Sequence, residues 1–185
     1  MNILFRLLLT FNATSLLVII FIVQKKYTLS YFLDVATNQL NWITLMPNMA
    51  SYFIYALIPV FLTGISLLLS KKLGKDELKK GNIVSIEYAN NSFLPSYLGY
   101  FFVALSVGSW ESLWFVYGIL FIFTFLSQAL YFNPLFLIFG YTFYNVRTIN
   151  GTVIFLISRH KYKTPGDIEI SSAFRINDYT FIERS

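Results

Sequence analysis

The sequence contains no cysteine, a single histidine and few charged residues. The absence of cysteine excludes disulfide bonds and thiolate metal sites. Lys, Arg, Asp and Glu together make up 12% of the chain, whereas a soluble domain carries about 25%. Hydrophobic residues account for 56%. This composition predicts a membrane protein.

Residues that commonly carry out catalysis are sparse as well. His160 stands between Arg159 and Lys161, which makes it a poor general base, and we interpret it as an ordinary exposed residue at a strand end. The nine acidic residues are scattered singly apart from Asp76–Glu77, and no glycine-rich phosphate loop is present. We therefore expect no enzyme activity, no catalytic or metal-binding residue and no cofactor.

Four apolar stretches without charge are long enough to cross a hydrocarbon core of about 30 Å. They cover residues 7–23, 50–70, 93–108 and 113–132. The expected fold is an α-helical membrane protein, with a four-helix transmembrane bundle in residues 1–145. An outer loop (24–49), predicted to hold a short amphipathic helix, and a cytoplasmic loop (71–92) join the spans. Residues 133–145 form either a helix along the inner interface or a re-entrant piece.

The distribution of basic residues predicts the orientation of these spans. Twelve of the 14 Lys and Arg residues fall on one side of the predicted membrane, and Lys25 and Lys26 fall on the other. The positive-inside rule then places both termini in the cytoplasm. Trp42, Trp110 and Trp114 fall near the outer interface, where amphipathic rings prefer to lie.

The tail, residues 146–185, predicts a small cytoplasmic antiparallel β module. Asn150–Gly151 is a strong hairpin signal, since both residues tolerate positive φ, and it precedes "TVIFLIS", a run too short to cross a membrane. Further turns at Pro165–Gly166 and Asn177–Asp178 separate two more strand-like runs, which together predict a meander. Residues 81–91 also have strand character, and we expect them to complete the module.

Two groups of basic residues are candidates for binding. Arg159, Lys161 and Lys163 form a hypothetical partner-binding group, because their charge would steer an acidic surface. A second group would contact lipid headgroups or a partner: Lys71, Lys72, Lys75, Lys79 and Lys80. Acidic residues interrupt this basic field, so we expect no direct binding of nucleic acid.

The overall plan resembles a known family. The start "MNILFRLLLTFNATSLLVIIFIVQKK", the four spans and the tail "NGTVIFLISRHKYKTPGDIEI…AFRINDYTFIER" are similar to the KwaA family, the membrane subunits of Kiwa antiphage defence systems. The resemblance implies a homo-oligomer, a homotetramer, in the bacterial inner membrane. It also implies a soluble DNA-binding partner (KwaB-like) and a response to phage at the envelope.

A different class of protein also fits the residues. A small oligomeric channel, a transporter-like protein or a bacteriocin-immunity protein would share the apolar spans. Coupled transporters usually carry ionisable groups within the membrane, and the predicted spans have none. Their polar residues, such as Asn12, Thr63 and Ser66, are sufficient for hydrogen bonds between helices. A pore lined by Ser127 and Gln128 in several copies is the remaining form of this alternative.

Overall fold

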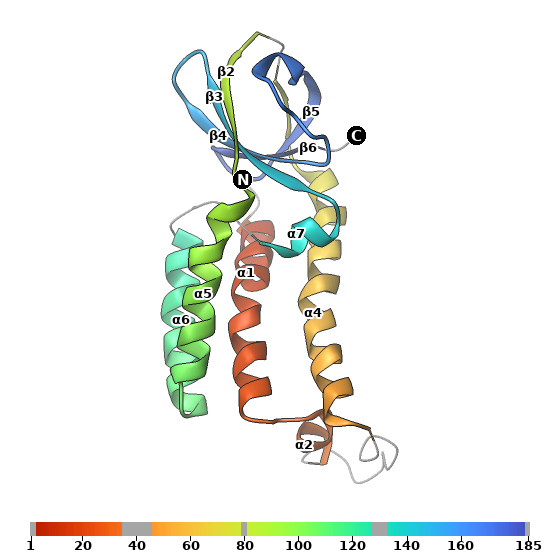
Figure 1. The fold of residues 1–185 in the computed structure, drawn as a ribbon, viewed down its shortest axis with the longest axis vertical. Coiled ribbons are helices and arrows are strands. Elements are labelled where there is room, and N and C mark those ends of the chain that lie inside the picture. Colours follow the sequence, from red (N-terminus) through yellow and green to blue (C-terminus); the bar gives the residue numbers. More distant parts are fainter. Residues whose placement is uncertain (1–2, 35–45, 79–80, 127–132, 184–185) are drawn as a thin grey trace.

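The computed structural model describes residues 3–34, 46–78, 81–126 and 133–183. Figure 1 shows a group of helices at one end of the molecule and a curled sheet at the other, with the start of the chain at the junction between them. The end of the chain lies beside the sheet (Figure 1).

Two long helices connect the two ends of the molecule. They are α1 (Ile3–Gln24) and α4 (Asn48–Leu69), and a short 3-10 turn, η1 (Ser70–Lys72), continues α4. At 1.5 Å per residue, a helix of 22 residues is about 33 Å long. Of the described helices, α1 and the segment Asn48–Lys72 are long and apolar enough to span a membrane.

The prediction of a four-helix transmembrane bundle was wrong. The third predicted span is α5 (Leu94–Ser106), and the described part of the fourth is α6 (Trp110–Leu126). Their 13 and 17 residues correspond to only about 20 and 26 Å. The third run loses its first residue, Phe93, to the 3-10 turn η2 (Asn90–Phe93), and α5 ends at Ser106. α6 begins at Trp110, three residues before the predicted fourth run, and the Ser109 hydroxyl accepts the Ser112 N–H there.

α1 packs against α4, α5 and α6. Its polar side chains are buried there: the Asn12 amide contacts the Thr63 hydroxyl of α4 at 3.0 Å, and the Thr14 hydroxyl donates to the Tyr117 hydroxyl of α6 at 3.2 Å. Hydrogen bonds of this kind join helices where apolar burial provides little driving force. The prediction that the polar residues serve contacts between helices is confirmed for Asn12 and Thr63, and Thr14 makes a further contact of this kind.

Aromatic side chains gather at the end of the helices far from the sheet. A stretch after α1 forms the short helix α2 (Leu29–Asp34), whose position at that end is visible in Figure 1. The Tyr27 and Trp110 rings are stacked with centroids 5.5 Å apart, and Phe32 lies edge-on to Trp110. These contacts join the connection after α1 to the turn between α5 and α6. Trp42 lies outside the described residues.

The six strands form one mixed sheet with the order β1-β5-β6-β4-β3-β2. Their bounds are β1 (Lys75–Leu78), β2 (Ile83–Tyr88), β3 (Thr142–Thr148), β4 (Val153–Ser158), β5 (Ile170–Arg175) and β6 (Thr180–Glu183). A four-residue helix, α7 (Leu135–Ile138), precedes β3. The segment predicted as an interfacial helix or re-entrant piece, residues 133–145, therefore holds this short helix and the first four residues of β3.

The predicted antiparallel meander was also wrong. β3 and β4 do form the hairpin around Asn150–Gly151, where Gly151 has φ of 79°. However, β4 pairs with β6 in parallel, and β6 separates β4 from β5. Parallel strands need a long crossover connection. Residues 159–179 provide it, and they include β5 itself.

The sheet curls toward a barrel. Its two edge strands, β1 and β2, are joined through residues 79–82, and the five steps from Leu78 to Ile83 span at most about 18 Å. Figure 1 shows the resulting curvature. Inside the curl lie Ile154 and Leu156 of β4, together with Val146 and Phe181 from the neighbouring strands.

The other face of β4 packs toward the helices. Phe155 and Ile157 contact a second core, which includes Phe5 and Leu9 of α1, Leu67 of α4 and Phe136 of α7. A strand buried on both faces reads as a continuous apolar run, which explains "VIFLI". The prediction that this run is a strand is confirmed.

Candidate functional site

The strongest candidate for a binding surface is the extended segment after β4, which we call the basic segment (residues 159–163). Arg159, Lys161 and Lys163 are exposed in it. The residues that alternate with them, Ser158 just before the segment, His160 and Tyr162, engage one buried carboxylate. The alternation directs the cations to solvent while the other side chains hold the backbone.

That carboxylate belongs to Glu183 at the end of β6, which is 7% exposed. The Tyr162 hydroxyl donates to both of its oxygens at 2.8 Å, and the Ser158 hydroxyl donates to Oε2. The His160 Nδ1 lies 3.2 Å from Oε1. We call these four residues the Glu183 cluster. Buried charges require such hydrogen bonds to offset the loss of hydration.

Hydrogen bonds to its backbone also hold the basic segment, in addition to the Glu183 cluster. The His160 N–H donates to the Ser158 hydroxyl at 2.8 Å. The Tyr144 hydroxyl of β3 donates to the His160 carbonyl and accepts the Tyr162 N–H, both at 3.2 Å. The basic segment is thus attached to β3, β4 and β6 at once.

The protonation of Tyr162 supports this arrangement. Burial raises its pKa, and both the hydrogen bond to Glu183 and the negative charge of Glu183 raise it further. The phenol therefore remains a hydrogen-bond donor throughout the physiological pH range. The Ser158 hydroxyl donates to the same carboxylate and accepts the His160 N–H. The geometry is suited to holding the segment in place.

A short turn ends the basic segment on its other side. η3 (Pro165–Asp167) follows Thr164, and the Asp167 carboxylate accepts the N–H groups of Thr164 at 2.9 Å and Lys163 at 3.3 Å. The hydrogen bonds from the backbone and side chain of Thr164 lower the pKa of Asp167 below its ordinary value of 3.8. The carboxylate is therefore charged when it holds the turn.

The second basic group lies elsewhere on the molecule. Lys71 and Lys72 are exposed in η1, directly after α4. Lys75 starts β1, and its Nζ lies 5.7 Å from the centroid of the Phe174 ring. Lys79 and Lys80 lie outside the described residues. The described lysines of this group lie in η1 at the end of α4 and at the start of the edge strand β1. The basic segment instead comes directly after the central strand β4.

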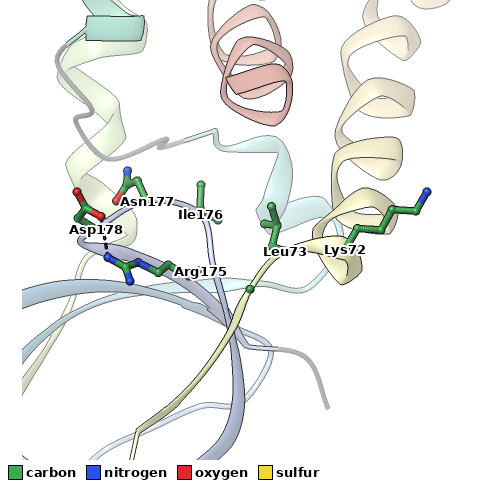
Figure 2. Close-up of a pocket in the computed structure, with 7 residues that line it drawn as sticks. Lys72, Leu73, Arg175, Ile176, Asn177 and Asp178 are labelled. Atoms are coloured by element: carbon green, nitrogen blue, oxygen red, sulfur yellow. Dashed lines mark hydrogen bonds and ion pairs between the residues drawn. The ribbon is translucent and has the colours of Figure 1, made fainter. Parts of the chain in front are cut away.

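A cavity of about 350 Å³ lies between η1 and the turn from β5 to β6. Figure 2 shows Lys72 and Arg175 on opposite sides of it, with the Lys72 side chain directed away. The Arg175 guanidinium donates to Asp178 at 2.7 Å and lies 4.0 Å from the carboxylate of Asp76. The two carboxylates neutralise the charge of Arg175. Lys72 and Arg175 therefore do not form a single anion-binding site in the cavity.

Sequence reasoning missed Glu183 and Tyr162 and treated His160 as an ordinary exposed residue. The side chain of His160 is 55% exposed, yet its ring faces Glu183. One signal was available in the sequence: Glu183 ends the largely apolar run "YTFIE", which follows other strand-like apolar runs in the tail. An acidic residue in such a strand requires partners, and hydroxyl and imidazole groups are suitable ones.

Comparison with known proteins gives one match. The family model described as "Anti-phage protein KwaA" matches residues 5–182. No curated protein and no solved structure matches the chain. The match includes α1 from Phe5 onward, all of α4, the sheet as far as Ile182 of β6, and the basic segment.

Proposed function

The chain belongs to the KwaA family of anti-phage proteins, and we propose that it is the non-catalytic membrane subunit of an antiphage defence complex. In this proposal it is anchored in the bacterial inner membrane and senses phage at the envelope. Its sheet faces the cytoplasm and recruits a soluble DNA-binding partner (KwaB-like). The observation that carries the recruitment step is the exposed basic segment, held to β4 and β6 by the Glu183 cluster and to β3 by Tyr144.

The membrane anchor is supported by α1 and α4. Both are long and apolar enough to cross a bilayer, and their sheet-proximal ends carry Arg6, Lys71 and Lys72. Lys25 and Lys26 lie at the opposite end of α1. The positive-inside rule then favours a cytoplasmic sheet, with both termini on the same side.

This orientation is testable by cysteine labelling, because the natural chain contains no cysteine to react in the background. Intact spheroplasts carrying Lys26→Cys or Asn150→Cys are treated with a membrane-impermeant maleimide. We expect Lys26→Cys to react before lysis and Asn150→Cys to react only afterwards. Labelling of Asn150→Cys in intact spheroplasts would contradict the proposed orientation.

Partner docking rests on Lys161 and Lys163. Arg159 differs from them, because its guanidinium lies 4.8 Å from the centroid of the Tyr141 ring and lines a groove on α4. Exposed charges on a well-held segment would steer an acidic surface of the partner toward the sheet. This attraction should weaken as salt shortens the Debye length.

The test is co-purification of the soluble partner with membranes carrying Lys161→Glu/Lys163→Glu. We expect a several-fold loss of recruitment at low salt and a smaller difference at high salt. Lys71→Glu/Lys72→Glu is the matched control, with the same change in charge at the end of α4. Equal loss in both double variants would show that only net charge matters and would contradict docking at the basic segment.

Charge reversal is a cleaner test than truncation. Deleting residues 163–185 would remove β5 and β6 from the middle of the sheet. Ile170, Phe174 and Ile182 would then be lost from the two cores. If the truncated chain failed to recruit the partner, the cause could equally be an unfolded sheet or the loss of the docking surface. The truncation would not separate these two causes.

We also propose that the subunit assembles with copies of itself as a homotetramer. Large apolar side chains on the described parts of α5 and α6 are exposed, among them Phe102, Phe115 and Phe123. Lipid and like subunits are the surroundings that suit such a surface, and closed symmetry is the usual result of self-association. Native mass measurement in mild detergent tests this proposal, and a monomer that retains recruitment would contradict it.

A further inference from the structure

A groove of about 680 Å³ runs along α4 and ends at the sheet. Its walls are apolar side chains of α4 between Leu57 and Leu68, together with the Phe139 ring that follows α7. Arg159 is its single charged lining residue. The groove therefore combines a long apolar surface with one cation at the end nearest the sheet.

Gly64 keeps the middle of the groove open. A Cβ added there would lie 3.5 Å from the Phe139 ring, an ordinary van der Waals contact. A methyl group is thus accommodated, but any longer side chain would project into the groove beside Phe139. The position offers a way to fill the groove by substitution.

Arg159 is placed to bind an anion at the end of the groove. Its guanidinium lies over the buried Tyr141 ring, which orients the planar group. Among the described residues, no carboxylate lies within ion-pair distance of Arg159. The guanidinium fork matches the geometry of a phosphate group.

The length of the groove fits one leaflet of a bilayer. The residues from Leu57 to Leu68 cover about 16 Å of helix, close to half of a hydrocarbon core of about 30 Å. A molecule that filled the groove would place its polar end at Arg159, beside the sheet. Basic pockets on the cytoplasmic side of membrane helices are suited to anionic headgroups.

We propose that this groove binds an anionic phospholipid of the cytoplasmic leaflet, with an acyl chain along α4 and the phosphate on Arg159. The proposal rests on the membrane insertion and orientation proposed above. A second copy of the chain is the less suitable occupant. A two-fold contact through this face would bring two Arg159 side chains to one interface without a carboxylate from the groove lining.

The test is native mass spectrometry of the full chain in detergent with added dioleoyl phosphatidylglycerol or dioleoyl phosphatidylcholine. We expect the chain to retain phosphatidylglycerol in preference to phosphatidylcholine. Arg159→Gln should remove this preference, with a several-fold loss of bound phosphatidylglycerol. Lys161→Gln is the matched control, because it removes an exposed cation two residues away that does not line the groove, and it should retain the preference.

A second pair of variants tests the apolar part. Gly64→Phe should reduce the retention of both lipids, whereas Gly64→Ala should leave it unchanged. The proposal is overturned if Arg159→Gln retains phosphatidylglycerol as the natural chain does, if Lys161→Gln loses it equally, or if Gly64→Phe has no effect.

Disulfide formation tests whether a second copy of the chain, instead of a lipid, occupies the groove. In a Phe61→Cys variant the introduced cysteine is the only one in the chain, so an efficient disulfide-linked dimer in membranes would place a second copy at the groove and overturn the proposal. Resistance to alkaline extraction is measured in parallel. A chain released from membranes by this treatment would contradict the proposed insertion itself, whereas an inserted chain without lipid preference would contradict only the lipid site.

Discussion

The two segments that build the sheet occupy different places in it. Residues 75–88, between α4 and α5, supply β1 and β2, which are the two edges. Residues 142–183 supply the four interior strands. Val84 and Tyr88 of β2 are 57% and 67% exposed, whereas Leu156 of β4 and Ile182 of β6 are almost completely buried. The interior segment therefore carries most of the packing, and the edge segment closes the sheet at either side.

The same difference separates the two basic groups. Lys161 and Lys163 follow the central strand β4, and the Glu183 cluster attaches their segment to the interior of the sheet. Lys71 and Lys72 follow α4 and precede an edge strand. Two pairs of lysines are thus coupled to different parts of the fold, the first pair to the sheet and the second pair to α4.

Truncating a side chain on an interior strand should have the largest effect. Ile182→Ala removes buried methyl groups from the core beneath the sheet, and we expect a loss of about 2–5 kcal/mol in the free energy of unfolding. Val84→Ala on the edge strand should change it by less than about 0.5 kcal/mol. Thermal unfolding in detergent, followed by circular dichroism, measures both. Similar losses in the two variants would show that the edge and interior strands contribute equally.

Removing the carboxylate of Glu183 should have the next largest effect. In Glu183→Ala, the hydroxyl groups of Ser158 and Tyr162 lose their shared acceptor, which we expect to destabilise the sheet by about 1–3 kcal/mol. The basic segment should also become several-fold more sensitive to trypsin, which cleaves after Lys and Arg. Glu183→Gln keeps one acceptor oxygen and should be intermediate. A basic segment as resistant in Glu183→Ala as in the natural chain would show that the backbone contacts of Tyr144 hold it alone.

The sequence was sufficient to predict individual strands and turns of the sheet, but not the order in which the strands pair. The hairpin at Asn150–Gly151 and the strand at "TVIFLIS" were predictable, because turn chemistry and run length are local properties. Strand character in residues 81–91 was visible too, and Ile83–Tyr88 is indeed an edge strand beside β3. The parallel pairing of β4 with β6 was not predictable, since alternation indicates which face a residue lies on and does not identify the neighbouring strand.

The errors in the helical part have a physical cause as well. An apolar run records where a helix is able to form, but its ends depend on capping and turn contacts. The 3-10 turn at Asn90–Phe93 delays the start of α5 to Leu94, whereas the Ser109 hydroxyl accepts the Ser112 N–H where α6 begins, three residues before the predicted fourth run. The Glu183 cluster was missed because Glu183 lies 21 to 25 residues along the chain from its three partners. The roles of Lys161 and Lys163 in partner binding stay predictions.

A surface ion pair at the β1 edge should matter much less than the Glu183 cluster. Arg175→Gln removes contacts with Asp178 and Asp76, but the Arg175 side chain is 48% exposed, so water screens both contacts. We expect a loss below about 1 kcal/mol, measured by the same thermal unfolding. Asp178→Asn, which removes the closer partner, should give a similar or smaller loss. A destabilisation as large as that of Glu183→Ala would indicate that the β1 edge is coupled tightly to the interior.

The smallest effect is expected at Asp167, which holds the end of the basic segment in the turn before β5. Its hydrogen bonds from Thr164 lower its pKa below 3.8, so the carboxylate stabilises the folded turn at any pH above that value. This contribution is lost as the pH falls through the lowered pKa of the folded state. Asp167→Asn should therefore change little at neutral pH, because the amide oxygen still accepts the Thr164 N–H. In acid, the natural chain should come to resemble the variant. Hydrogen exchange of the peptide containing Lys163 and Thr164, compared between the two chains at each pH, measures the difference. A difference that grows on acidification would have the wrong sign and would contradict the role assigned to the carboxylate.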